Sequence, residues 1–302
     1  MKVFKLLLIL IFTLSIILSS SLLAQDKKEI KKDYEAKEKI KIDLALGSCS
    51  IKNSNDGRIH VHVVYSYDDE SFEPRFREKS NTLYLEEKFY GDTPRGRSDW
   101  KLQIPQDIKI DFNSGIGDLY IEGKSAEIEG NTGTGTIEIT LAQSEFDLNS
   151  GTGNIEVVDS EGDFALNSGT GRVKIKNSKG DFKANSGTGN VEASVITIIS
   201  DGNFNSGTGD AEVKSPKGDD FDLSINSGTG DALLNMQGSP IVGYFEFSTH
   251  LRRGRIVSPV DFDQEEEYWQ GDSQYIRKSF TKEKDTPRFY ISTGTGRAEL
   301  KR

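Results

Sequence analysis

Cysteine, tryptophan, histidine and proline are all scarce in this sequence of 302 residues, with one, two, three and seven copies respectively. The single cysteine, Cys49, excludes an intrachain disulfide and the cysteine clusters that bind structural zinc. No G-x-S-x-G segment of a serine hydrolase occurs, and three histidines offer little for acid–base chemistry. Glycine is plentiful, with 30 copies, and it recurs in a fixed pattern.

Residues 1–24 have the layout of a secretory signal peptide. Lys2 and Lys5 precede an apolar stretch at 6–18, and a serine-rich segment leads to Ala24. We expect cleavage after Ala24, with an uncleaved membrane anchor as the alternative. No cysteine lies near this point, which argues against a lipoprotein. The sequence therefore predicts an exported protein, located in the periplasm, on the cell surface or in the medium.

Acidic residues outnumber basic ones. Residues 1–24 hold two lysines and no acids, so 36 of the 38 basic residues and all 48 acids remain after cleavage, a net charge of −12. Such a charge disfavours nucleic acid and anionic lipid as partners. Membrane contact is expected only through the 1–24 segment if it stays attached. Residues 25–38 are dense in both charge signs with a single isoleucine, and they predict a solvated linker.

A five-residue motif occurs eight times. It reads NSGIG at residue 113, NTGTG at 131, NSGTG at 149, 167, 185, 205 and 226, and STGTG at 292. The first four steps are 18 residues long, the next two are 20 and 21, and the last is 66. A step this constant indicates a repeated structural unit, whereas a phosphate-binding loop would occur once.

The residues around each motif alternate between apolar and polar. Ile155 and Val157 follow one motif with Glu156 between them, and Phe146 and Leu148 precede it. Each unit of about 18 residues therefore predicts two short strands and two turns, which bury their apolar faces only when units stack. We expect an all-β protein, a β-solenoid or parallel β-helix with two short strands per coil.

Stacking makes further predictions about the motif. Equivalent residues would lie about 4.8 Å apart along the axis, so the asparagines would form an amide ladder and the threonines a hydroxyl row. The two glycines would supply positive-φ positions for the turn. Residues 39–112 are expected to cap the solenoid with further strands, 113–236 to form the repeats, 237–290 an irregular insertion and 291–302 the terminal coil.

The tandem S/T-G-x-G units, the segment WKLQIPQDIKIDFNSGIGDLYIEG at 100–123 and the signal peptide resemble a bacterial domain-of-unknown-function family labelled "putative adhesin". The resemblance covers roughly residues 40–302. It implies an exported, right-handed β-helical module of the cell envelope. It carries over no catalytic residues.

Calcium and nucleotide sites are both disfavoured by the residues at the repeat turns. The residue after the second glycine is Asp118, Thr136, Asn154, Arg172, Asn190, Asp210, Asp231 and Arg297 in turn. Calcium needs several oxygen ligands, and an arginine in the column would repel it. No G-x-G-x-x-G is completed after any repeat. The serine and threonine rows leave ice binding as an alternative.

Two groups of polar side chains on strand faces are candidate sites. His60 and His62 share one strand face and could hold a metal, although a solvent-facing pair is the simpler interpretation. Glutamates at 138, 156, 192 and 212 line one face, as in carbohydrate-active β-helices, but a wet face relieved by Lys174 explains them. We predict no catalytic residue, metal site or cofactor.

The insertion at 237–290 is the best candidate for recognition. It contains Arg252, Arg253 and Arg255, then Tyr268 and Trp269, residue types typical of binding anchors. Alternatively the segment caps the last coil, with the tryptophan packed on its end. The sequence favours a non-enzymatic envelope solenoid for adhesion or assembly, which binds a protein or glycan. A carbohydrate-active enzyme and a structural or signalling-linked periplasmic domain are the alternatives; the oligomeric state stays open.

Overall fold

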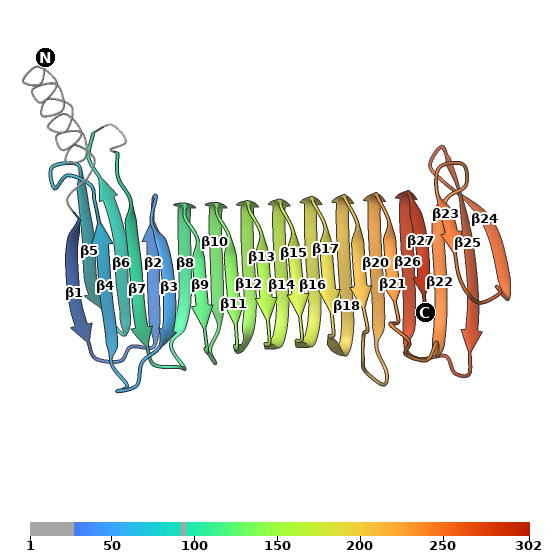
Figure 1. Ribbon diagram of the computed structural model, residues 1–302, viewed down its shortest axis with the longest axis horizontal. Coiled ribbons are helices and arrows are strands. Elements are labelled where there is room, and N and C mark those ends of the chain that lie inside the picture. Colours follow the sequence, from blue (N-terminus) through green and yellow to red (C-terminus); the bar gives the residue numbers. More distant parts are fainter. Residues whose placement is uncertain (1–26, 92–94) are drawn as a thin grey trace, which may run out of the picture.

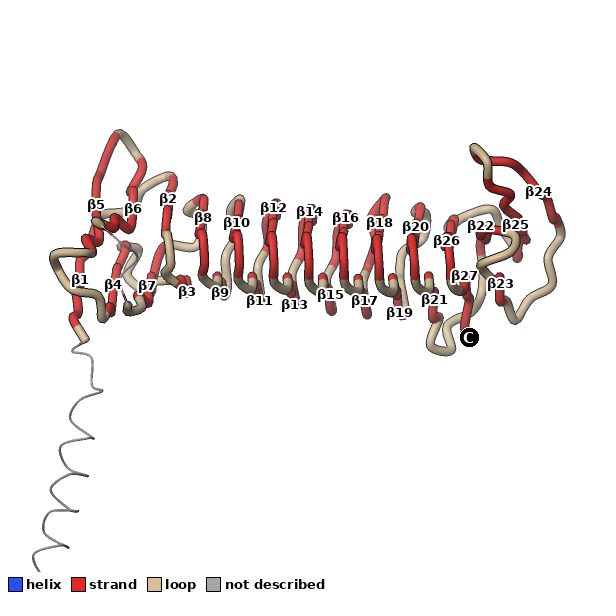
Figure 2. The backbone as a smooth tube through the Cα atoms, turned by 90° about the horizontal axis from the view of Figure 1, so that it is seen from above, coloured by secondary structure: helices blue, strands red, loops and turns tan. Residues whose placement is uncertain are grey.

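Two strands from each repeat build two long sheets that face each other across one core (Figure 1). The computed structural model describes residues 27–91 and 95–302, so the signal peptide predicted for 1–24 lies outside the described residues. The all-β solenoid expected from the repeats is confirmed. Seen from above, the coils follow one another along a single axis (Figure 2).

The strands of each sheet follow the order of the coils. Within the described residues, sheet A has the spatial order β1 (Lys28–Tyr34), β4 (Ile59–Tyr65), β7 (Ser98–Ile104), β3 (Ser48–Asn53), β9 (Leu119–Glu122), β11 (Ile137–Thr140), β13 (Ile155–Val158), β15 (Val173–Lys176), β17 (Val191–Ser194), β19 (Ala211–Lys214), β21 (Ala232–Asn235), β27 (Arg297–Lys301) and β23 (Arg255–Val257). Sheet B has the order β24 (Gln264–Gln270), β25 (Ser273–Lys282), β22 (Gly243–His250), β26 (Arg288–Thr295), β20 (Asp222–Thr229), β18 (Thr197–Thr208), β16 (Lys179–Thr188), β14 (Glu161–Thr170), β12 (Gln143–Thr152), β10 (Ile128–Thr134), β8 (Lys109–Ile116), β2 (Lys39–Leu44), β6 (Thr82–Phe89) and β5 (Phe72–Lys79).

The repeated motifs align in one column. Parallel pairing places Asn131 opposite Asn149 and Asn149 opposite Asn167, and the same register continues through the other repeats. The inner faces of the two sheets form the core, where Leu148 and Ile155 are fully buried. The rings of Phe146, Phe164 and Phe182 stack along the axis, with centroids 4.7 and 4.8 Å apart.

The two motif glycines are required for different reasons, which corrects the expectation that both take positive φ. The second glycine does in seven of the eight motifs, as at Gly153 with φ +150°. The first, such as Gly151, is not among the positive-φ residues; a Cβ there would lie 2.6 Å from the carbonyl oxygen of Gly133 in the preceding coil. Close approach of the backbones therefore excludes a side chain at the first position.

The turn on the other side of each coil puts non-glycine residues in the left-handed region. Leu141 and Val195 both have φ near +55°, and both side chains are exposed. A β-branched residue is strained in this conformation, by about 1–2 kcal/mol, whereas asparagine tolerates it.

We expect Val195→Asn to raise the free energy of unfolding by about 1 kcal/mol, because it relieves this strain and loses little apolar burial. The neighbouring coil shows that an amide fits, since Asn177 donates to Asp159 at 2.5 Å in the same column. Chemical denaturation measures the change. A loss of stability would contradict the explanation.

The N-terminal region folds into the same two sheets. β2 and β3 form a coil that pairs with the first repeat, with Ile42 opposite Phe112 and Cys49 opposite Leu119. The linker predicted for 25–38 is wrong over Lys28–Tyr34, which forms β1 and pairs antiparallel with β4. The charged side chains of β1 are compatible with a strand because β1 lies at the edge of the sheet and its side chains are only partly buried.

No helix among the described residues is long and apolar enough to cross a membrane.

The irregular insertion predicted for 237–290 is also wrong, because this segment contains four strands. β22 pairs in parallel with β26, so the last coil lies between β20 and β22. Phe245 stacks on Phe289 of that coil and on Phe280 of β25, with centroids 4.4 and 4.8 Å apart. The segment therefore closes the apolar end of the solenoid, and the C-terminal coil is internal.

Candidate functional site

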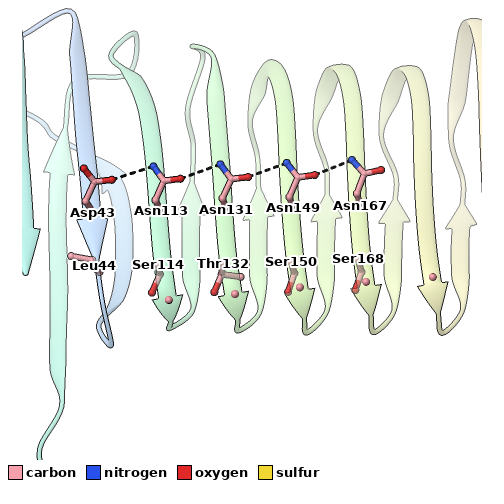
Figure 3. Close-up of a pocket in the computed structure, with 15 residues that line it drawn as sticks. Asp43, Leu44, Asn113, Ser114, Asn131, Thr132, Asn149, Ser150, Asn167 and Ser168 are labelled. Carbon is pink, nitrogen blue, oxygen red and sulfur yellow. Dashed lines mark hydrogen bonds between the residues drawn. The ribbon is translucent and has the colours of Figure 1, made fainter. Parts of the chain in front are cut away.

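The asparagine ladder runs along the outer face of sheet B, and its amides bond to one another. Each Nδ2 donates to the Oδ1 of the preceding asparagine at 2.7–3.3 Å, through Asn113, Asn131, Asn149, Asn167, Asn185, Asn205 and Asn226. A shallow groove of about 770 Å³ follows this ladder and the glycines beside it (Figure 3). Asp43 accepts from the first asparagine and Ser292 donates to the last. The predicted ladder is confirmed as a coil-to-coil contact.

The serine of each motif is also engaged within the stack. Ser150 is buried, and its hydroxyl donates to the carbonyl oxygen of Gly135 in the preceding coil at 2.9 Å. Ser168 does the same with Gly153 at 2.8 Å. The threonine row predicted from the sequence is in register and exposed, with Thr152 opposite Thr170. Among the motif side chains that the structure describes, the threonines therefore form the row that is most exposed to solvent.

The column considered for calcium has a structural role that sequence reasoning missed. Asp118 accepts from the backbone amide of Thr136 at 2.7 Å, one coil further on. Asp231 accepts from the amide and the guanidinium of Arg297 in the same way. Desolvation raises the pKa of the Asp231 carboxyl, but these hydrogen bonds outweigh it and hold the pKa below its usual value. The side chains fasten one turn to the next.

The glutamate stripe on sheet A is bridged by basic side chains. Glu156 pairs with Lys174 at 2.5 Å, and Glu192 pairs with Arg172 at 3.4 Å. Glu212 pairs with Lys214 at 2.8 Å. This pairing supports the interpretation of the stripe as a wet face. Among the described residues, no group of three or more histidine, cysteine or acidic side chains could hold a metal ion.

The two histidines that could have formed a metal site instead contact side chains of the first strand, β1. His60 lies 2.7 Å from Asp33 of β1 through Nδ1 and 3.0 Å from Asp56 through Nε2. Hydrogen bonds to these two carboxylates raise the pKa of His60. The imidazole of His62 lies against the carboxylate of Glu29 of β1. Both pairs therefore fasten an otherwise exposed edge strand to β4.

Lys124 is a buried cation in the turn column, where its ammonium donates to the carbonyl of Pro105. Burial lowers its pKa to about 8, although the charge of Asp107 acts in the opposite direction. Between pH 8 and the ordinary value of 10.5, the unfolded chain binds a proton that the folded protein releases. The contribution of Lys124 to stability therefore rises with pH across that window.

We expect Lys124→Met to be more stable than the wild type at pH 7. The difference should shrink by about 3 kcal/mol up to pH 10.5, where the lysine is neutral in the folded protein and half-neutral in the unfolded chain. Urea denaturation at a series of pH values measures the difference. A difference that does not vary with pH would show that the ammonium is not desolvated.

The predicted recognition residues lie on both sheets of the segment that closes the C-terminal end of the solenoid, β22–β25, which we call the cap. Arg252 and Arg253 lie in the turn after β22, and Arg255 begins β23 in sheet A. Tyr268 and Trp269 lie on β24 in sheet B. The segment caps the last coil, as the alternative supposed, but Trp269 is 68% exposed and does not pack on that coil.

An aromatic surface covers the outer side of the cap. Tyr268 stacks on Tyr275 with centroids 5.7 Å apart, and its hydroxyl lies 2.8 Å from Ser248. The guanidinium of Arg277 lies 4.9 Å from the Tyr268 ring. Arg277 is not one of the three arginines that the sequence analysis proposed for recognition. Tyr244 and Tyr290 continue this surface, with centroids 6.2 Å apart. We call these five residues, Tyr244, Tyr268, Tyr275, Arg277 and Tyr290, the cap face.

Sequence reasoning missed three of the cap-face tyrosines and Arg277. A usable signal was present, because GYFEFSTH and SQYIRKSF alternate and place Tyr244 and Tyr275 on outward positions. The repeat strands carry asparagine, serine, alanine or charged residues at those positions. The cap thus differs from the repeats in the residue types that it presents.

This architecture defines a β-solenoid whose repeats are internally paired and whose ends are closed by additional strands. The chain belongs to the Toastrack DUF4097 family, which matches residues 37–239. The resemblance drawn from the repeats is therefore confirmed at the level of the family. The match ends before β22, so the strands β22–β25 of the cap lie beyond it.

Several solved structures are similar over most of their length. They include a "putative cell adhesion protein" from Clostridium sporogenes (15% identity, 91% of this chain and 99% of that one, TM-score 0.29). Others are a "putative adhesin" from Bacteroides fragilis (15%, 92% and 98%, TM-score 0.33) and a "putative lipid binding protein" from Parabacteroides distasonis (8%, 91% and 97%, TM-score 0.28). No curated protein matches the chain. At these TM-scores the likenesses carry no argument about function.

Proposed function

We propose that this protein is an exported binding scaffold of the cell envelope, without catalytic activity, which recognises a partner through its C-terminal cap. The observation that carries the proposal is a contrast along the molecule. In the repeats, asparagine, serine and turn side chains bond to the neighbouring coil. In the cap, Tyr268 and Tyr275 of the cap face stack on each other, and Trp269 is exposed on the opposite face of β24. Tyrosine, tryptophan and arginine are the residue types that dominate binding energy at protein surfaces.

The stack of coils suits a scaffold that holds the cap at a distance from the N-terminal end of the molecule. Parallel coils that bond to one another through backbone and side chains resist bending between the two ends. The predicted signal peptide places the protein in the periplasm, on the cell surface or in the medium. The partner class, a protein or a glycan, follows from the aromatic and charged character of the cap, and adhesion or assembly is the role that such a contact would serve.

Binding to envelope extracts and to a glycan array tests the proposal. Deletion of residues 245–285 is unsuitable, because it removes Phe245, which covers Phe289 of the last coil. Trp269→Ala with Tyr275→Ser alters the cap alone, and we expect it to reduce binding at least tenfold. Tyr120→Ala, an exposed aromatic on sheet A, is the matched control and should bind normally.

A second control addresses the enzymatic alternative. Glu156→Ala with Glu192→Ala removes two of the acids on which a carbohydrate-active face would depend. We expect this variant to bind like the wild type and expect neither protein to degrade a polysaccharide panel. Loss of polysaccharide turnover in this variant alone would establish the enzyme instead. Unchanged binding by the cap variant would contradict the assignment to the cap.

A further inference from the structure

Sheet B ends in two edge strands of complementary charge, β24 at the C-terminal end and β5 at the N-terminal end (Figure 1). β24 reads QEEEYWQ, with three acids and no base. β5 reads FEPRFREK, with three bases and two acids. Among the described strands, each pairs on one side only, to β25 and β6 respectively, so its other backbone edge can accept a further strand.

The directions of the two edges are compatible with pairing. β22 runs parallel to the last coil, and two antiparallel steps through β25 restore that direction in β24. β6 runs parallel to β2, and one antiparallel step reverses β5. When a second copy is stacked end to end along the axis, its β5 therefore runs antiparallel to β24 of the first. Antiparallel ladders are the more stable kind.

The lateral positions of the two edges also correspond. The column of the asparagine ladder passes from Asn226 through Ser292, Ser248 and Arg277 to Glu266 of β24. At the other end, it passes from Asn113 through Asp43 and Glu86 to Arg75 of β5. Straight stacking therefore places Glu266 opposite Arg75 of the next copy.

The neighbouring positions follow from the same register. Tyr268 would face Glu73, Gln264 would face Arg77, and Trp269 would face Phe72. The Glu266 side chain can turn towards Arg75 of the next copy, because it is 67% exposed and its contact with Arg277 is 3.8 Å long.

We propose that the protein associates head to tail, with β24 of one copy adding to β5 of the next, so that sheet B continues across the junction. The contact is heterologous, because each copy offers two different surfaces, and it therefore builds linear chains of solenoids. Pro74 would face Glu267 and has no amide to donate, which removes one ladder hydrogen bond at the centre. The association is accordingly reversible and depends on protein and salt concentration. It goes beyond the proposed binding function and does not depend on it.

Sedimentation equilibrium of the protein purified after export tests the proposal. The average mass of the wild type should rise with concentration and fall when salt is raised. Glu266→Arg and Arg75→Glu should each weaken self-association at least tenfold, because each places like charges across the junction. Glu138→Arg, on sheet A in the middle of the solenoid, is the matched control and should associate like the wild type.

The decisive readout is charge exchange. An equimolar mixture of Glu266→Arg and Arg75→Glu proteins should associate again, as should the double variant, because opposite charges then meet at the junctions. Variants that lost their fold would not be rescued in this way. A wild type that stays monomeric at all concentrations, or single variants that associate unchanged, would overturn the proposal. Partner binding by the dilute monomer is measured separately, so failure here leaves the cap assignment intact.

Discussion

Replacement of Gly171 by alanine is expected to destabilise the protein by about 4 kcal/mol or more, which is exceptional for the addition of one methyl group. Gly171 has φ +148°, and an added Cβ would lie 2.1 Å from the carbonyl oxygen of Gly153 in the preceding coil. The overlap involves backbone on both sides, so it is relieved only when the coils separate. Separation would stretch the hydrogen bond from the Gly153 amide to the carbonyl oxygen of Thr170, which is 2.9 Å long and joins these two coils.

Gly57→Ala is the matched control for this prediction. Gly57 also has positive φ, at +75°, but nothing lies within 4 Å of an added Cβ. Its replacement should cost only the backbone strain, about 1 kcal/mol. Guanidinium denaturation of the two variants separates strain from overlap. Equal losses in both variants would show that the coils do not approach as closely as described.

Phe164→Ala is expected to cost about 3–5 kcal/mol, the range for removal of a fully buried phenylalanine. Its ring lies between Phe146 and Phe182, and it is 3% exposed. The cavity cannot collapse easily, because in-register backbone hydrogen bonds fix the spacing of the coils on both sides. Contacts in a solenoid join only neighbouring coils, so the change should also weaken the coupling between the two halves of the stack.

Thermal unfolding followed by calorimetry measures both consequences of Phe164→Ala. We expect a lower transition temperature and a broader transition, or two transitions, in place of a single cooperative one. Tyr120→Ala, which alters an aromatic that is 41% exposed, should leave the transition nearly unchanged. A loss below about 1 kcal/mol for Phe164→Ala would contradict the continuous aromatic stack.

The repeated coils could be predicted from the sequence because their pairing is local. Each strand pairs with the strand one repeat away, so a constant step of 18 residues fixes the register of Asn149 and Ile155 at once. The roles of single positions were less accessible. Gly151 looks like a turn residue in the sequence, whereas its role is the close approach of another backbone that only the stacked structure reveals.

The ends of the molecule were harder to predict, because their strands pair out of sequence order. The sequence of β1 is typical of a charged linker, and only its pairing with β4, which carries His60 and His62, shows that it is a strand. Tyr290 and Tyr244 are 46 residues apart in the chain and become neighbours through the insertion of β26 beside β22. The sequence analysis therefore named one member of the cap face, Tyr268, and missed the other four.

Cysteine cross-linking tests most directly whether the repeats form a scaffold of stacked coils. Glu138 and Glu156 are register partners on neighbouring coils, about 4.8 Å apart, within the range for a disulfide. Cys49 should not interfere, because it is 1% exposed and burial raises its pKa. Glu138→Cys with Glu192→Cys, three coils apart in the same column, is the control. We predict complete cross-linking of the first pair on mild oxidation and none of the second. Absence of the first cross-link, or equal yields from both pairs, would contradict the stacked solenoid.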